Sequence, residues 1–305
     1  PLDNTLPLSP ERPKKTVKVA NPIPVSKTKQ SADSKVNDEN KLPLDAVAAV
    51  TPVVDAVDYI ASENLEPVSD PDVKFKSLME GLESKDWIKI CDSLNDVRRL
   101  ALYHSELLLP ILEKVVMVLV KSMKNPRSAL CKTAIMAAAD IFKSFGDKLV
   151  ESSTPNDAVD QMMLQLLLKA SQDKKFVCEE AERTLKTMVV STTPIPLLHK
   201  LKVYVKHANM RVRAKAAVSI SHCVSKMGTV EMRDYGLVSL AQMSAELLKD
   251  RLPEAREAAR GMVLSVYKAV MEDGENEEEE KWLNFCQKHL PAIDALTMVK
   301  LVASQ

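Results

Sequence analysis

The sequence is poor in the residues that β-sheet proteins use most. Only 6 of its 305 residues are glycine, and aromatic side chains make up 4% of the chain. Sheet proteins usually need more glycine in their turns, and more aromatic or β-branched side chains on their pleated faces. Leu, Ala, Val, Lys, Glu and Met dominate instead, and most of these residues favour helices. The composition therefore predicts an all-helical protein.

Signatures of catalysis and of metal binding are missing. The motifs G-x-x-x-x-G-K-[ST], G-x-G-x-x-G, H-E-x-x-H and G-x-S-x-G do not occur. The histidines are scattered without the i, i+4 spacing of a shared metal, and no two of the five cysteines form a C-x-x-C pair. We therefore expect no enzymatic activity, no cofactor and no metal. The cysteines are interpreted as free buried thiols in the cytosol, which is a reducing compartment.

Long apolar runs and an excess of one charge are missing too. Lys and Arg number 42, as do Asp and Glu, so the net charge gives no reason to expect nucleic acid as a partner. The apolar stretch 107–120 is broken by Pro110, Glu113 and Lys114, and it is shorter than the roughly 20 residues of a membrane helix. The chain begins at Pro1 without a signal-peptide pattern, so we expect a fragment or a processed end.

The first 70 residues predict a disordered tail. Up to residue 42, prolines lie among lysines, serines and asparagines without any apolar period. Residues 44–65 are more apolar and have room for one short helix, which Pro52 would interrupt. The tail is a possible binding site for another protein.

From residue 71 to residue 305 the sequence reads as a series of amphipathic helices. Several helix starts show a capping residue followed by proline, which loses nothing at the first helical position because that N–H has no partner there. These pairs are Asp70-Pro71, Asn125-Pro126, Thr154-Pro155 and Thr193-Pro194, and Pro253 and Pro291 are also expected to open helices.

The helices group into pairs that repeat along the chain. The first helices of the pairs are expected near 72–83, 106–123, 155–171, 194–206, 230–249 and 277–289. The second helices are expected near 87–103, 126–145, 175–190, 209–226, 253–271 and 291–303. Second helices begin at a mean spacing of about 41 residues, which is the period of HEAT and armadillo repeats. Since one pair cannot bury its own apolar face, stacked pairs predict an α-solenoid of about six HEAT-type pairs.

The turns within the pairs carry the candidate binding residues. In a solenoid these turns emerge along one edge, and every one of the first five contains lysine or arginine. Trp87 and Phe176 add large apolar side chains to this basic edge, a combination that suits docking onto an acidic protein surface. Two simpler interpretations stay open, namely that each aromatic ring packs into the core and that the basic residues are only solvated. The candidate residues are Lys85, Trp87, Asn125, Arg127, Ser128, Lys175, Phe176, Asn209, Arg211, Arg213, Arg251 and Arg256.

The turn sequences resemble those of TOG domains, particularly the ones in the CLASP and crescerin (TOG array) families. The similar stretches are LESKDW at 82–87, NPRS at 125–128, KFVCEEA at 175–181, NMRVR at 209–213 and PEAREAAR at 253–260. Each stretch is weak alone, but the five occur in order at the expected repeat positions, across about residues 72–290.

This resemblance implies a flat paddle of six HEAT repeats whose turn edge binds tubulin and regulates microtubule growth, pausing or rescue. It further implies that Trp87 packs against β-tubulin and that Arg127 and Phe176 extend the contact. Arg211 and Arg256 would face α-tubulin. We therefore expect a cytoplasmic protein on the microtubule cytoskeleton, with αβ-tubulin as its partner and no role for nucleic acid or membrane.

An alternative function is a non-catalytic HEAT scaffold that binds a different protein. A third possibility, cargo recognition in nuclear transport, is disfavoured because the repeated Trp/Asn ladder of armadillo importins is absent. Only one TOG domain is visible, whereas members of these families usually carry several. A single domain lacks the effective-concentration gain of an array, so association with the microtubule lattice would need the tail, self-association or a partner.

Overall fold

The computed structural model describes residues 59–151, 157–272 and 278–304, without the side chains of residues 278 and 279. The chain divides into two compact units, 1–53 and 54–305, and every described residue belongs to the second. The predicted disorder up to residue 58, most of the possible helix at 44–65, and the helix start at Thr154-Pro155 lie outside the described residues.

The described residues form stacked pairs of antiparallel helices, as the sequence predicted, and contain no strand. The first pair is α1 (Pro71–Leu82) with α2 (Trp87–Tyr103). In the second pair, the first arm consists of α3 (Ser105–Leu108), η2 (Leu109–Ile111) and α4 (Leu112–Met123), and the second arm is α5 (Ser128–Glu151). The third and fourth are α6 (Ala158–Lys169) with α7 (Lys175–Val190), and α8 (Pro194–Lys202) and η3 (Val203–Lys206) with α9 (Met210–Lys226). The last two are α10 (Thr229–Tyr235) and α11 (Leu237–Leu247) with α12 (Pro253–Met271), and α13 (Glu278–His289) with α14 (Ala292–Ala303).

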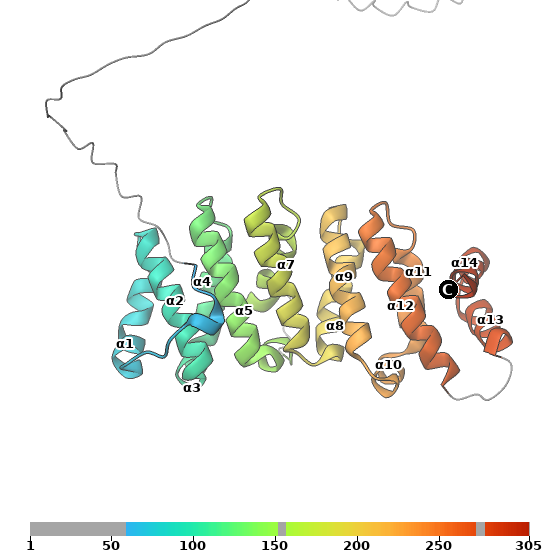
Figure 1. The fold of residues 1–305 in the computed structure, drawn as a ribbon, viewed down its shortest axis with the longest axis horizontal. Helices are drawn as coiled ribbons and strands as arrows, with labels where there is room; N and C mark the ends of the chain where they lie inside the picture. The colour runs from blue at the N-terminus through green and yellow to red at the C-terminus, as the bar shows by residue number, and fades with distance from the viewer. Residues whose placement is uncertain (1–58, 152–156, 273–277, 305) are drawn as a thin grey trace, which may run out of the picture. The chain divides into compact units, whose positions relative to one another are not determined.

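The pairs stand side by side in one row (Figure 1). Each second helix packs on the second helix of the next pair, in the order α2, α5, α7, α9, α12 and α14. In α2, Cys91, Leu94, Val97 and Ala101 form an apolar stripe that is fully buried between these layers. The predicted burial of the cysteines holds for four of the five, and Cys178 is half-buried.

Two first helices that the sequence predicted as continuous are broken. Pro110 lies in the 3-10 turn η2, which separates α3 from α4, because proline has no N–H for the helical ladder. Gly236 separates α10 from α11 with a φ of 105°, in the left-handed region that glycine adopts at little cost. The breaks change the direction of the chain but leave α4 and α11 paired with their second helices.

The predicted helix starts differ in their chemistry. Asp70 caps α1 by accepting the N–H of Val73. Thr193 precedes Pro194 but makes no cap, because its N–H and hydroxyl donate to Asp147 instead. Prolines 126 and 291 were expected to be the first residues of α5 and α14, but α5 begins two residues later, at Ser128, and α14 begins one residue later, at Ala292.

Residues 59–70, which the sequence assigned to the tail, pack on α2 and α5. The hydroxyl of Ser62 donates to Asp140 over 2.6 Å, and the hydroxyl of Tyr103 donates to the carbonyl of Leu65 over 2.6 Å. Asp140 also forms a fully buried ion pair with Arg98 at 2.7 Å, which joins α5 to α2. The folded unit thus extends in front of α1, and its first two pairs are tied by charge as well as by apolar packing.

The candidate binding edge

The turns inside the pairs lie along one edge of the row. They comprise residues 83–86, 124–127, 170–174, 207–209 and 248–252. Figure 1 shows these turns at the upper edge, with α3, α10 and the turn between α7 and α8 at the lower edge. We call the five turns and the first residues of the helices that follow them the turn edge. The candidate residues of the first pair and those of the fifth therefore share one side of the fold.

The first two turns bring Trp87 and Arg127 together. Asp86 accepts the N–H of Ile88 and so fixes the start of α2, where Trp87 is half-buried against the core. The guanidinium carbon of Arg127 lies 5.2 Å from the centre of the Trp87 ring, a cation–π arrangement. Residues 40 positions apart therefore form one composite surface, in which an apolar ring is covered by an exposed cation.

The second turn is stiffened by its own side chain. The amide oxygen of Asn125 accepts the N–H of Arg127 over 2.9 Å. The side chain of Asn125 is half-buried and therefore holds the backbone of the turn. Ser128 is the half-buried first residue of α5. Lys85, in the first turn, is exposed. Of these candidates, Lys85 and Arg127 present charge to solvent, whereas Asn125 shapes the turn that carries Arg127.

The third turn presents one apolar and several basic side chains. Phe176, the second residue of α7, is 44% exposed although it is large and aromatic. Its neighbour Lys175 extends into solvent, with 87% of its side chain exposed, and lies 3.7 Å from Glu179. Such a loose surface ion pair contributes little to the free energy of folding, so the ammonium group of Lys175 stays available to a partner.

Arg211 links the fourth turn to the third. Asn209 caps α9 by accepting the N–H of Arg211 over 2.9 Å. The guanidinium of Arg211 donates to the carbonyl of Ser171 and to the carboxylate of Asp173, at 3.2 and 3.0 Å. More than half of the Arg211 side chain still faces solvent, so the residue bridges two turns and remains exposed.

Arg213 and Arg256 use their donors within the protein. Arg213 pairs with the buried carboxylate of Asp250 at 2.7 Å and donates to the carbonyl of His207 at 2.8 Å. Arg256 donates to the carbonyls of Asp250 and Arg251, at 2.9 and 2.8 Å. Both arginines are half-buried, whereas Arg251 is exposed. The arginine pair therefore holds the shape of the fourth and fifth turns.

Asp250 is the centre of this arrangement, and the sequence analysis did not single it out. Burial by itself would raise the pKa of its carboxyl group, but the N–H of Leu252 and the guanidinium of Arg213 outweigh burial and lower that pKa. The sequence does carry a signal for this role. Asp250 stands two residues before Leu252, which is the spacing at which an aspartate accepts a backbone N–H in an Asx turn. Lys124 and Lys174 are further exposed cations of the edge that the candidate set left out.

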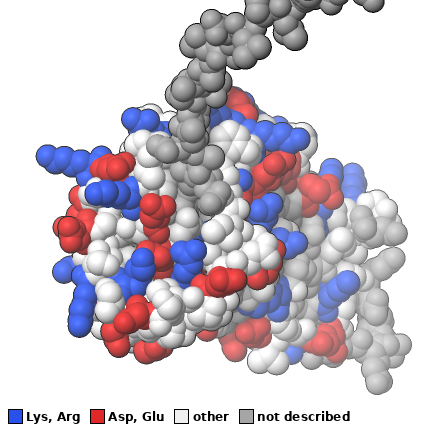
Figure 2. All heavy atoms as spheres, turned by 60° about the vertical axis from the view of Figure 1, so that its left-hand side comes forward, with Lys and Arg blue, Asp and Glu red and all other residues white. Residues whose placement is uncertain are grey.

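Charge is mixed on the side of the fold nearest α1. Figure 2 shows the side of the fold nearest α1, where basic and acidic side chains alternate without forming a single patch. Within the described ranges, no group of three or more His, Cys, Asp or Glu side chains could hold a metal ion. Among the same residues, no helix is long and apolar enough to cross a membrane. The turn edge combines exposed cations with half-exposed aromatic rings.

Comparison with known proteins places this fold among TOG domains. The TOG domain of Zyg9 from C. elegans superposes with a TM-score of 0.55, at 16% identity, over 80% of this chain and 90% of that domain. A structure described under "TOG-tubulin binding specificity promotes microtubule dynamics and mitotic spindle formation" gives a TM-score of 0.51, at 16% identity, over 74% and 80% of the two chains. At these identities the similarity establishes the fold.

Sequence comparison gives the family. TOG array regulator of axonemal microtubules protein 1 from Mus musculus is 28% identical over 219 residues, which are 69% of this chain and 12% of that protein. The chain thus spans about an eighth of the length of this relative. Residues 97–280 match the family described as CLASP N terminal, and this match takes in more than half of the chain. The protein therefore belongs to the CLASP N-terminal family and has the fold of a TOG domain.

Proposed function

We propose that this chain binds αβ-tubulin through the turn edge and thereby regulates microtubule dynamics. Two comparisons support the proposal in its broad form. A relative is named as a regulator of axonemal microtubules, and a structural neighbour comes from work on TOG–tubulin binding. Because the chain corresponds to a small part of that relative, the proposal concerns what this domain binds. Its location on cytoplasmic microtubules is part of the same proposal.

The contact between Arg127 and Trp87 is the observation that carries the proposal. Binding energy at protein interfaces concentrates in a few Trp, Tyr and Arg side chains that are held in place before the partner arrives. Asp86 and Asn125 fix the two turns, and the guanidinium rests 5.2 Å from the ring centre. A docking partner would therefore meet an apolar anchor and a cation whose positions are already set.

The rest of the edge divides into contact and positioning residues. Phe176 offers a second apolar contact, and Lys85, Lys175 and Arg251 offer exposed positive charge that would speed the encounter with an acidic surface. Arg211 would contact the partner while it bridges two turns. The proposed role of Arg213 and Arg256 is indirect, because both use their donors to fix turns around Asp250. Asn125 and Asn209 shape helix starts in the same indirect way, and Ser128 is the half-buried first residue of α5.

A binding isotherm with unpolymerised tubulin tests the proposal. Arg127→Glu should weaken affinity by about tenfold or more, since it removes the cation over Trp87 and places a negative charge before an acidic partner. Lys148→Glu is the matched control, because Lys148 is also exposed but lies in the last turn of α5. It is about 30 Å along the helix from the turn edge.

Two outcomes would count against the proposal. Equal affinity of Arg127→Glu and the native chain would remove the turn edge as the binding surface. If the native chain did not bind tubulin at all, the tubulin function would fail and the scaffold function would replace it.

A further inference from the structure

Residues 59–70, which pack on α2 and α5 in front of the first helix pair, are called the strap. The centre of the Tyr59 ring lies 4.4 Å from the ammonium nitrogen of Lys132 in α5. Three residues later, the hydroxyl of Ser62 donates to Asp140, which lies eight residues further along α5. Because α5 begins at the turn edge, the strap runs away from that edge. Its first described residue, Tyr59, therefore lies at the turn-edge end of the strap.

Tyr59 lies close to the pair formed by Trp87 and Arg127. Burial, and after it the charge of the nearby Cys91, raise the pKa of the Tyr59 hydroxyl, so the ring also lies near α2. Cys91 follows Trp87 by four residues, which is about 6 Å along the helix. Lys132 follows Arg127 by five residues. The Tyr59–Lys132 pair is thus about one helical turn below the Trp87–Arg127 pair, between the same two helices.

Both pairs combine an aromatic ring with a cation, but in the opposite order. In the first pair Arg127 is exposed and covers the half-buried Trp87. In the second pair the ring of Tyr59 is 43% exposed, whereas the side chain of Lys132 is 19% exposed and lies 3.8 Å from Glu180. The inner cation holds the outer ring by a cation–π contact. Tyr59 is therefore an exposed aromatic side chain whose position is set before a partner arrives, which lowers the entropic cost of binding.

A partner docked on the turn edge near Trp87 would reach Tyr59. A protein interface of ordinary size buries about 800 Å² on each partner, which is a patch roughly 30 Å across. The side chains that contribute most of the binding energy gather near the middle of such a patch and are enriched in Trp, Tyr and Arg. With Trp87 and Arg127 near the middle, a ring about 6 Å further along the helices lies inside the patch.

We propose that Tyr59 is a further contact residue for the partner of the turn edge. This inference rests on the proposed function, in which that partner is αβ-tubulin. The ring of Tyr59 suits an apolar patch on the partner, and its hydroxyl suits a polar group beside that patch. The binding surface then continues from the turn edge onto the strap, so a segment in front of the first helix pair takes part in recognition.

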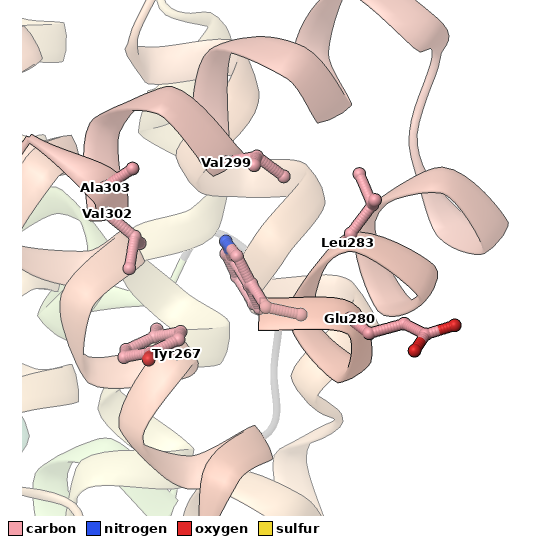
Figure 3. Close-up of a pocket in the computed structure, with 7 residues that line it drawn as sticks. Tyr267, Glu280, Leu283, Val299, Val302 and Ala303 are labelled. Atoms are coloured by element: carbon pink, nitrogen blue, oxygen red, sulfur yellow. The ribbon is translucent and has the colours of Figure 1, made fainter. Parts of the chain in front are cut away.

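An open apolar surface at the other end of the row provides a distant control. A pocket of about 580 Å³ lies between α12, α13 and α14. Figure 3 shows Leu283 of α13 across this pocket from Val302 and Ala303 of α14. In Figure 1, α13 and α14 lie at one end of the row and α2 lies near the other. Leu283→Ala therefore removes apolar contact area far from Tyr59 and from the Trp87 ring.

Binding isotherms of the 305-residue chain with unpolymerised tubulin test the contact. Tyr59→Ala should weaken affinity by about fivefold or more, because it removes an exposed aromatic ring from the patch. Tyr59→Phe should lose less, since it keeps the ring that Lys132 holds. Leu283→Ala should bind like the native chain. Unchanged affinity of Tyr59→Ala, or an equal loss with Leu283→Ala, would overturn the proposal.

A photo-crosslink distinguishes direct contact from an indirect effect of the strap. Tyr59 and Tyr103 are 43% and 45% exposed, and Tyr103 binds the other end of the strap through the carbonyl of Leu65. Tyr103 lies about 24 Å along α2 from Trp87. Irradiation of Tyr59→p-benzoylphenylalanine should link the chain to tubulin, and irradiation of Tyr103→p-benzoylphenylalanine should not. The same yield at both positions, or no product at position 59, would overturn the contact.

The contact of Tyr59 and the tubulin function can fail separately. If Arg127→Glu loses affinity while Tyr59→Ala keeps it, the turn edge remains the tubulin-binding surface and only the contact of Tyr59 is refuted. A native chain that does not bind tubulin would refute the proposed function and the contact together.

Discussion

Trp87 is the residue at which binding and folding can be separated most sharply. It begins α2, and its ring is half-buried, with its base packed on the core and Arg127 over one face. Trp87→Ala removes this partly buried ring. The change should reduce the free energy of unfolding by about 1–3 kcal/mol, less than for a fully buried tryptophan. If the ring is an anchor for tubulin, the same substitution should cost about 2 kcal/mol of binding free energy, or roughly thirtyfold in affinity.

Arg127→Glu gives the complementary measurement. Arg127 is exposed, and its charge acts within the protein mainly through the Trp87 ring, so the stability change should stay within about 1 kcal/mol. Its effect on tubulin affinity should nevertheless approach that of Trp87→Ala. In a double-mutant cycle the two changes should be non-additive in binding, because they alter one composite surface.

Thermal melts and tubulin-binding isotherms on the same preparations would provide these values. Lys148→Glu again serves as the control, because it alters an exposed charge at the other end of α5. If Trp87→Ala unfolds the domain while Arg127→Glu binds tubulin normally, Trp87 is a structural residue and the turn edge is not the binding surface.

Three further predictions follow from the charges of the fold. Tubulin affinity should fall strongly between about 50 and 200 mM salt, since the cations of the turn edge are exposed and are screened by salt. An affinity that does not change with salt concentration would indicate that tubulin binds an apolar surface instead. Arg98→Met should lower the free energy of unfolding by up to about 3–5 kcal/mol, because it removes the 2.7 Å partner of the buried Asp140 carboxylate and leaves only Lys143 at 3.1 Å and the Ser62 hydroxyl. A thermal melt that shows a loss under about 1 kcal/mol would contradict this. The pKa of Asp250 is lowered in the fold, so its charge stabilises the native state above the ordinary value of 3.8, and that contribution is lost as the pH falls through the lower folded value. Denaturation of the native chain and of Asp250→Asn should therefore differ most at neutral pH and converge in acid, and a constant difference would refute the assignment.

The sequence alone determined the helices and their pairing. Helix-forming residues, the apolar stripe of α2 and a repeat near 41 residues are local or periodic signals, and stacked pairs are the arrangement that buries such stripes. The expected range of α2, 87–103, agrees with the structure at both ends. The same periodicity placed the turns on one edge, so the candidate surface could be located before any coordinates were known.

Breaks within helices were harder to predict. Pro110 lies inside the expected helix 106–123, but the split into α3, η2 and α4 depends on which backbone groups find partners nearby. Gly236 interrupts a stretch whose apolar period continues on both sides, and one glycine inside a helical pattern is a weak signal. Residues 59–70 lack a helical period, so only their contacts with α2 and α5 reveal them as part of the folded unit.

Only the tertiary structure decided what each arginine of the edge does. In the sequence, Arg127, Arg211, Arg213 and Arg256 are alike, because all four lie at the start of a second helix. In the fold, Arg127 covers a ring, Arg211 bridges two turns, and the other two fix backbone carbonyls around Asp250. A guanidinium has five donors and can bind groups far away in the sequence, so its role depends on which acceptors the stacking of neighbouring pairs brings within reach.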